Sequence, residues 1–255
     1  AQELRAYYME TYPAGTQTGN RITELIGTAD TDWQDLIFRT ALATEHNVSV
    51  YGNVKGRMPY RGSIGYSGQQ GTLKSSGYDR GTADNLTPSF LDGHLTLDLN
   101  MKGVYAWSDY ADSGAIGKAA FFNPTQDPYW RNSDGTIDYS TTNGFWNYGN
   151  GRGEQFSPNT LVGPSPLSII YDNISTARSQ RFIGRAALNY KVHGLEALSL
   201  NISAGLDITS TDSYNGMNPG SFQAYSDTDN LGIGEYSKGR NISRSQLFET
   251  YVSYK

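Results

Sequence analysis

The side chains best suited to binding chemistry lie in a long polar segment, residues 108–178. Aromatic faces stack on the apolar faces of sugar rings, and exposed Trp and Tyr make effective binding anchors. A long ordered loop also needs aromatic packing on itself or on a neighbouring protein, because ordering it costs conformational entropy. Both readings stay open at this point. The candidate ligand-binding aromatics are Tyr129, Trp130, Trp146 and Tyr148.

Two arginines form a second candidate site. Arg181 and Arg185 share one face of an alternating segment, and Lys191 follows in phase. Three charges on one strand face would be costly in a dry core, but they are tolerable beside water. We therefore expect Arg181 and Arg185 to line a wet ligand path. Ion pairing along a hydrated wall, or docking of another domain, would explain the same charges.

No catalytic motif is found in the sequence. There is no Gly-x-Ser-x-Gly elbow, no His-Glu-x-x-His helix and no phosphate loop. Residues 132–138 place oxygen-bearing side chains at alternate positions, as a calcium loop does, but a turn is the simpler reading of Asp134-Gly135. The absence of cysteine removes thiolate metal sites and disulfides. We therefore expect no enzyme, no catalytic residue, no metal site and no cofactor.

The elements that must position these residues are long alternating strands. Residues 197–209 read ALSLNISAGLDIT, so one face is wholly apolar and the other is small or polar. Residues 95–107 and 181–192 repeat the pattern, whereas residues 78–90 fit it poorly. About 9–11 tilted residues cross a membrane, while strands of soluble proteins have about 5–6. An apolar face of this height suits lipid, and the polar face suits a water-filled lumen.

Composition supports a β architecture and excludes two other classes. The chain has 255 residues with 29 glycines and 19 tyrosines, which favours β structure over helical packing. No run of about 18 apolar residues is present, so a transmembrane helix is excluded. A formal net charge of −5 and the lack of a basic stripe argue against a nucleic-acid partner.

The connections alternate between short and long. Residues 55–57, 91–94 and 193–196 are tight turns, whereas 108–178 and 213–240 are long and polar. Transmembrane barrels combine short periplasmic turns with long extracellular loops in this way. Residues 32–41 have helical spacing, with a capping box predicted from Thr31 and Gln34, and residues 2–10 predict a second short helix.

The predicted fold is therefore all-β, an antiparallel transmembrane β-barrel with long extracellular loops and one or two short loop helices. Residues 1–44 are the expected extracellular loop region with short helices, and residues 45–255 the barrel segment. The segment has about seven strands, fewer than the eight or more of single-chain barrels. We therefore expect a partial barrel that belongs to a longer polypeptide.

Several short segments resemble the SusC/RagA type of TonB-dependent outer-membrane transporters, in the order that this family has. Together they reach across most of the chain. They are residues 31–40 (TDWQDLIFRT), 46–50 (HNVSV), 59–66 (PYRGSIGY), 71–76 (GTLKSS), 86–92 (LTPSFLD), 114–117 (GAIG) and 123–126 (NPTQ).

The resemblance implies a barrel of about 22 strands around an N-terminal plug domain, with the plug and the remaining strands absent from this chain. It implies import of oligosaccharides or other large nutrients, such as peptides, across the outer membrane of Bacteroidetes. The implied partners are membrane lipid, a SusD-like surface lipoprotein that caps the barrel, and the TonB complex, which acts through the absent N-terminal region. The alternatives are a secreted carbohydrate-binding β-sandwich and a self-contained small porin. The sequence does not identify the transported nutrient.

Overall fold

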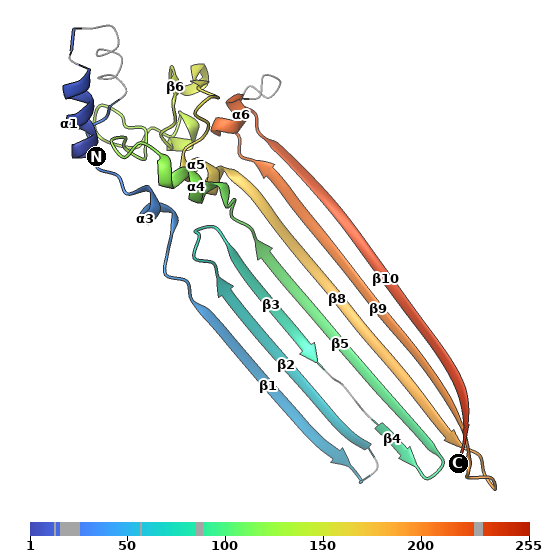
Figure 1. The fold of residues 1–255 in the computed structure, drawn as a ribbon. Coiled ribbons are helices and arrows are strands. Elements are labelled where there is room, and N and C mark those ends of the chain that lie inside the picture. The colour runs from blue at the N-terminus through green and yellow to red at the C-terminus, as the bar shows by residue number, and fades with distance from the viewer. Residues whose placement is uncertain (13, 16–25, 57, 85–88, 227–231) are drawn as a thin grey trace.

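The alternating segments pair, in chain order, into one antiparallel sheet. The computed structural model describes the whole chain except residues 13, 16–25, 57, 85–88 and 227–231. The sheet order is β1-β2-β3-β5-β8-β9-β10, and β4 also pairs with β5. Figure 1 shows these strands side by side as one long curved wall. Their bounds are β1 Ala43–Val54, β2 Met58–Gln70, β3 Gly77–Asp84, β4 Ser89–Asp92, β5 Leu95–Asp109, β8 Asn173–Lys191, β9 Leu198–Met217 and β10 Glu235–Tyr254.

The structure describes the weakest predicted strand in two pieces, β3 and β4, on either side of residues 85–88. β3 pairs with the C-terminal half of β5 and β4 pairs with its N-terminal half, so together they occupy one position in the sheet. This arrangement agrees with the poor alternation over residues 78–90. Counting β3 and β4 as one, the sheet has the seven strand positions that the sequence predicts.

The strand register places the apolar rows of neighbouring strands on one face. Leu200 pairs with Val252, and Leu188 with Ile202. These side chains remain open to the surroundings: Leu200 is 40% exposed and Val252 is 62% exposed. The other sheet in the described residues consists of two two-residue strands, β6 Gly149–Asn150 and β7 Ser157–Pro158. It is far too small to cover the rows, so the β-sandwich alternative is wrong.

Near the loops, polar and charged side chains replace the apolar ones on this face of the sheet. The Arg178 guanidinium lies 4.1 Å from the centre of the Trp107 ring. On the adjacent strands, the Arg240 Nε donates to the Asp212 carboxylate at 2.5 Å. The strands continue beyond these residues, since β9 and β10 each have 20 residues. The long loops are therefore shorter than predicted, spanning 110–172 and 218–234 instead of 108–178 and 213–240.

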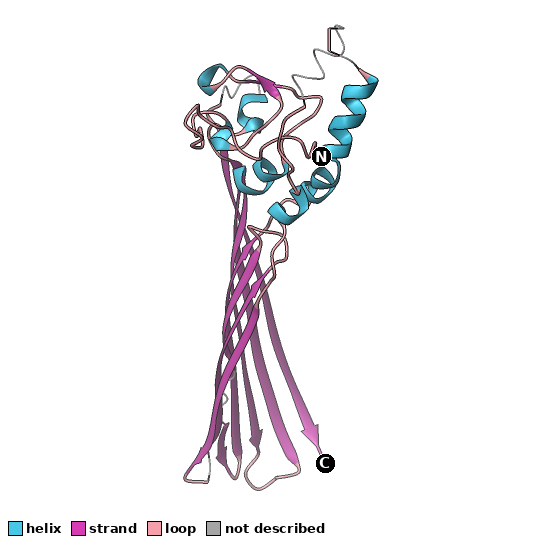
Figure 2. Ribbon diagram, turned by 90° about the vertical axis from the view of Figure 1, so that its left-hand side faces the viewer, coloured by secondary structure: helices cyan, strands magenta, loops and turns pink. Residues whose placement is uncertain are grey.

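Helices and irregular segments gather at one end of the sheet (Figure 2). Some of them pack around one buried cluster, which includes Trp33, Ile37, Ala119 and Leu167. No helix within the described ranges is long and apolar enough to cross a bilayer. The helices are α1 Gln2–Thr11, α3 Trp33–Ile37, α4 Gly114–Phe121, η1 Thr142–Gly144, η2 Gly153–Gln155, α5 Pro166–Asp172 and α6 Phe222–Ser226.

The predicted helix at residues 32–41 is shorter than expected and has a different cap. The Asp32 carboxylate, rather than Thr31, accepts from the backbone N–H groups of the first turn. The Thr31 hydroxyl donates instead to the carbonyl of Gln126 at 2.6 Å. Trp33 and Ile37 are both buried, as their spacing predicts. Tertiary contacts with the 123–126 loop therefore override the local capping box.

Candidate functional site

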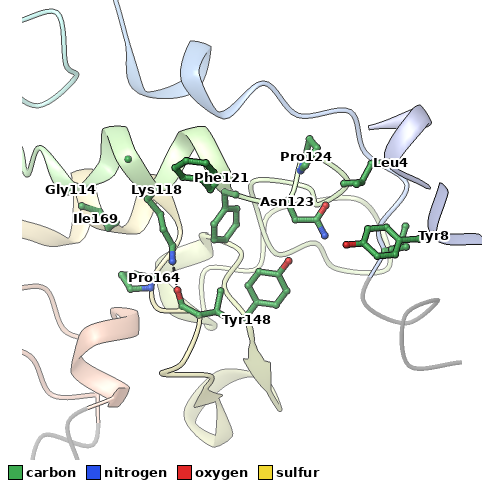
Figure 3. A pocket seen from close by; sticks show the side chains of 14 residues that line it. Leu4, Tyr8, Gly114, Lys118, Phe121, Asn123, Pro124, Tyr148, Pro164 and Ile169 are labelled. Carbon is green, nitrogen blue, oxygen red and sulfur yellow. Dashed lines mark hydrogen bonds between the residues drawn. The ribbon is translucent and has the colours of Figure 1, made fainter. Parts of the chain in front are cut away.

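A cavity of about 860 Å³ opens at the loop end of the molecule, between α1, α4 and the 147–164 loop. Its size lies within the range of about 300–1,000 Å³ that is usual for small-ligand sites. Figure 3 shows its lining side chains converging from these separate segments. The lining is mostly apolar and comprises Leu4, Tyr8, Ile26, Gly114, Gly117, Lys118, Phe121, Phe122, Asn123, Pro124, Tyr148, Val162, Pro164 and Ile169.

Helix α4 positions one wall of the cavity by burying its opposite side. Ala115 and Ala119 belong to the core cluster shared with α3 and α5. Gly114, Lys118 and Phe121 are four and three residues apart, so they share another face of the helix, and all three line the cavity. Phe121 is 92% exposed.

Helix α1 forms the other wall and is held by one arginine. The Arg5 guanidinium donates to the carbonyl of Gly27 at 2.7 and 3.2 Å. Gly27 in turn packs so tightly on the 123–126 loop that an added Cβ would lie 2.0 Å from the Thr125 carbonyl oxygen. These contacts bring Leu4 and Tyr8 to the cavity.

Lys118 is the charged residue of this lining, and the described lining residues include no carboxylate. Its ammonium donates to the carbonyl of Val162 and lies 5.7 Å from the centre of the Phe122 ring. Burial lowers the pKa of Lys118, and burial also raises the pKa of the Tyr148 phenol. The cavity therefore presents one partly desolvated cation against apolar and aromatic walls.

The four predicted aromatics take different places around this cavity. Tyr148 lines it. Trp146 packs edge-on behind Tyr148, with ring centres 4.6 Å apart. Trp130 lies 5.9 Å from Trp146, and Tyr129 pairs with Phe145 at 6.1 Å. Tyr129, Trp130 and Trp146 thus pack the loop on itself, which is the structural reading left open by the sequence.

The two predicted arginines lie on the sheet, apart from the aromatic cluster. Arg181 forms a bidentate pair with Asp207, its Nε at 3.0 Å and one terminal nitrogen at 2.6 Å from the two carboxylate oxygens. It also lines a depression of about 370 Å³ on the polar face with Arg80 and Lys102. Arg185 lies in another shallow depression beside Gly205 and Asp207. The structure therefore separates the arginines from the loop cavity.

Sequence reasoning missed Lys118 and Asn123. The helix that carries Lys118 and Phe121, GAIGKAAF, contains two glycines, which lower intrinsic helix propensity. It forms because its alanines pack in the core. Asn123 follows this helix inside NPTQ, a segment that the sequence marks only by family resemblance. No periodic signal distinguishes Lys118 or Asn123.

A buried carboxylate ties the loop segments together beside the start of β8. Asp172 is 1% exposed. Its two oxygens accept from the Asn143 amide at 2.7 Å and the Ser168 hydroxyl at 2.6 Å. The same Asn143 amide donates to the carbonyl of Pro219 at 3.0 Å, which links this loop to the β9–β10 connection. Burial raises the pKa of Asp172 to about 6.

Metal chemistry has no evident site in the part of the chain that the structure describes, where no group of three His, Cys, Asp or Glu side chains lies close enough to hold an ion. The 132–138 segment is a turn in which the Asp134 carboxylate accepts from the Thr136 hydroxyl at 2.7 Å.

Comparison with known proteins gives one close sequence relative and a group of structural neighbours. The chain is 38% identical over 211 residues to the TonB-dependent receptor SusC of Bacteroides thetaiotaomicron, covering 80% of this chain. Structures of the RagAB peptide importer in its closed-closed and open-open states match 90% of the chain, both at 18% identity, with TM-scores of 0.63 and 0.58. A further RagAB peptide transporter structure gives 0.63 at 19% identity. No family model matches the chain.

The chain spans only part of these proteins, 20% of the SusC relative and 24% of the matched RagAB chain. The structural match confirms the fold: an open antiparallel β-sheet that forms part of a larger transmembrane barrel.

Proposed function

We propose that this chain forms part of the wall of an outer-membrane nutrient importer. The premise is that the chain belongs to the SusC/RagA type of TonB-dependent transporters, as a segment of the barrel. Two comparisons support this proposal: the sequence relative is a TonB-dependent receptor, and the structural neighbours come from a peptide importer. Its location would be the outer membrane. Energy would arrive from TonB through a region that precedes this segment in the full transporter.

The apolar face of the sheet carries the proposal. Leu200, Ile202 and Val252 are large, apolar and 40–62% exposed, and no element in the described ranges covers them. A continuous apolar band of this height has a natural partner in lipid hydrocarbon. The opposite face bears Asn201, Ser203 and Asp207 and would face a hydrated lumen.

The loop end would form part of an extracellular chamber that receives the nutrient and contacts a SusD-like lipoprotein. In this proposal, residues 1–44 lie outside the cell. Tyr148 and Arg185 would contact the passing oligosaccharide or peptide, and Arg181 would line the path as one member of an ion pair. Tyr129, Trp130 and Trp146 would shape the loop that carries Tyr148. Transport would proceed by capture and gating, without a catalytic step.

Spin labels on adjacent residues test the wall. In the full-length transporter, reconstituted in lipid bilayers, single cysteines at Leu200 and Asn201 would carry the same nitroxide. We expect the label at 200 to be relaxed by oxygen, which concentrates in lipid, and the label at 201 by a water-soluble nickel complex. Because the residues are neighbours, differences in loop or strand mobility cannot produce this reversal. Equal accessibility to the nickel complex at both positions would refute a lipid-facing wall.

A further inference from the structure

The lining of the loop-end cavity is poorly matched to a neutral sugar. The polar side-chain groups of its lining are the Lys118 ammonium, the Asn123 amide and the hydroxyls of Tyr8 and Tyr148, and the rest of the lining is glycine, aliphatic or aromatic. Sugar recognition combines aromatic stacking with many directed hydrogen bonds, because each hydroxyl that loses water must find a partner. This lining offers few such partners. Its walls are better suited to an apolar side chain.

Lys118 adds one positive charge at a fixed place. One of its three N–H donors is directed to the Val162 carbonyl, which leaves two for a ligand. The ammonium lies beside the Phe122 ring, and no carboxylate among the described lining residues neutralises it. A cation in partly desolvated surroundings attracts an anion more strongly than one in open water. The site therefore complements a ligand with a single negative group.

Phe121 supplies an apolar contact at the edge of the cavity. It is almost fully exposed although it ends a well-packed helix. Figure 3 shows it beside Lys118 on the same helix, with Asn123 just after the helix and Tyr148 on a separate loop. An apolar group bound near Phe121 would thus lie close to the ammonium.

We propose that this cavity binds short peptides through their terminal carboxylate, with Lys118 holding the carboxylate and Phe121, Tyr8 and Tyr148 enclosing an apolar final side chain. The proposal rests on the proposed import function and narrows its substrate from oligosaccharide or peptide to peptides with an apolar carboxyl end. Asn123 lies on the lining, where its amide can donate a second hydrogen bond. A cavity of about 860 Å³ accommodates a ligand of two or three residues.

Calorimetry with matched peptides tests the proposal on the full-length transporter in detergent. The probe is an N-acetylated tripeptide ending in phenylalanine, compared with the same peptide bearing a terminal carboxamide and with a neutral glucose oligomer. We expect the free acid to bind at least tenfold more tightly than the carboxamide, because a charge-assisted contact is lost. Stronger binding of the glucose oligomer than of the acid, or equal binding of acid and carboxamide, would overturn the proposal.

Substitutions locate the effect. Lys118→Met should remove the preference for the acid, whereas Lys118→Arg should retain most of it. Lys55→Met is the matched control, since this lysine lies at the β1–β2 turn at the far end of the sheet. Phe121→Ala leaves the buried core intact and should weaken the acid and the carboxamide equally. A Lys118→Met protein that still prefers the acid would contradict the assignment.

The two proposals fail separately. If the label at Leu200 reports lipid and the peptides do not bind, the barrel wall stands and the peptide site is wrong. If the label reports water, both are wrong.

Discussion

Replacing Asp172 by asparagine tests whether this buried carboxyl makes the stability of the loop region depend on pH. The carboxyl is buried, and burial raises its pKa from 3.8 to about 6 despite hydrogen bonds from Ser168 and Asn143. The folded loop therefore holds the proton more tightly than the unfolded loop does. The free energy of local opening should fall as the pH rises from about 4 to about 6, and the loss should be complete above that range.

The size of the effect follows from the same pKa values. A rise from 3.8 to about 6 corresponds to about 3 kcal/mol, at about 1.4 kcal/mol for each unit of pKa. Asparagine has nearly the same shape and cannot ionise, so Asp172→Asn should abolish this pH dependence. Near pH 7 the variant should be at least as stable as the wild type, because it no longer buries a charge.

Hydrogen exchange of the full-length protein in detergent gives the required measurement. Peptides covering residues 141–145 and 166–172 would be followed between pH 4.5 and 7.5, with rates corrected for the intrinsic pH dependence of exchange. Asp134→Asn is a suitable control: hydrogen bonds from Thr136 hold the pKa of this exposed carboxyl below its usual value, so the substitution should leave the slope intact. An opening free energy in the wild type that does not change with pH would refute the reasoning, as would an unchanged slope in Asp172→Asn.

Two further predictions concern the sheet and the attachment of the N-terminal segment. Ile202→Lys places a charge on the apolar face and should destabilise membrane insertion by about 2–4 kcal/mol near the midplane, whereas Ser203→Lys on the polar face should cost far less; reversible folding into bilayers measures both, and equal costs would contradict the assigned faces. Gly27→Ala forces a Cβ to within 2.0 Å of the Thr125 carbonyl and should loosen this contact by about 1–3 kcal/mol, while Gly117→Ala meets no atom within 4 Å. Limited proteolysis near residue 27 reports the difference, and resistance equal to wild type would show that the loop tolerates the extra carbon.

The sheet was predictable because strand alternation is a local property. Residues 197–209 carry their face assignment in every second residue, and the register of β9 with β10 confirms it. The weak alternation over residues 78–90 was visible in the sequence, although the way β3 and β4 both pair with β5 was not. Strand ends were underestimated because β9 and β10 continue above the apolar band, where both faces are polar and the alternation in hydrophobicity disappears.

The loop cavity was largely beyond sequence reasoning. Trp146 and Tyr148 are two residues apart, yet one packs behind the cavity and the other lines it. Lys118 gains its position from alanines that pack on α3, a segment about 80 residues earlier in the chain. One local signal was available and unused: Ser165 followed by Pro166 marks the beginning of α5, and the Ser165 hydroxyl does accept from the Ser168 N–H.

The length of β9 and β10 has a consequence for where the transporter meets its surroundings. Twenty residues at about 3.3 Å each extend for about 65 Å, and a tilt of about 45° leaves about 45 Å of height. The hydrocarbon-facing band needs only about 25 Å. In the proposed orientation, the remaining 20 Å or so would raise the loops well clear of the lipid headgroups, so bulky solutes and water-soluble antibodies could reach them without touching the membrane.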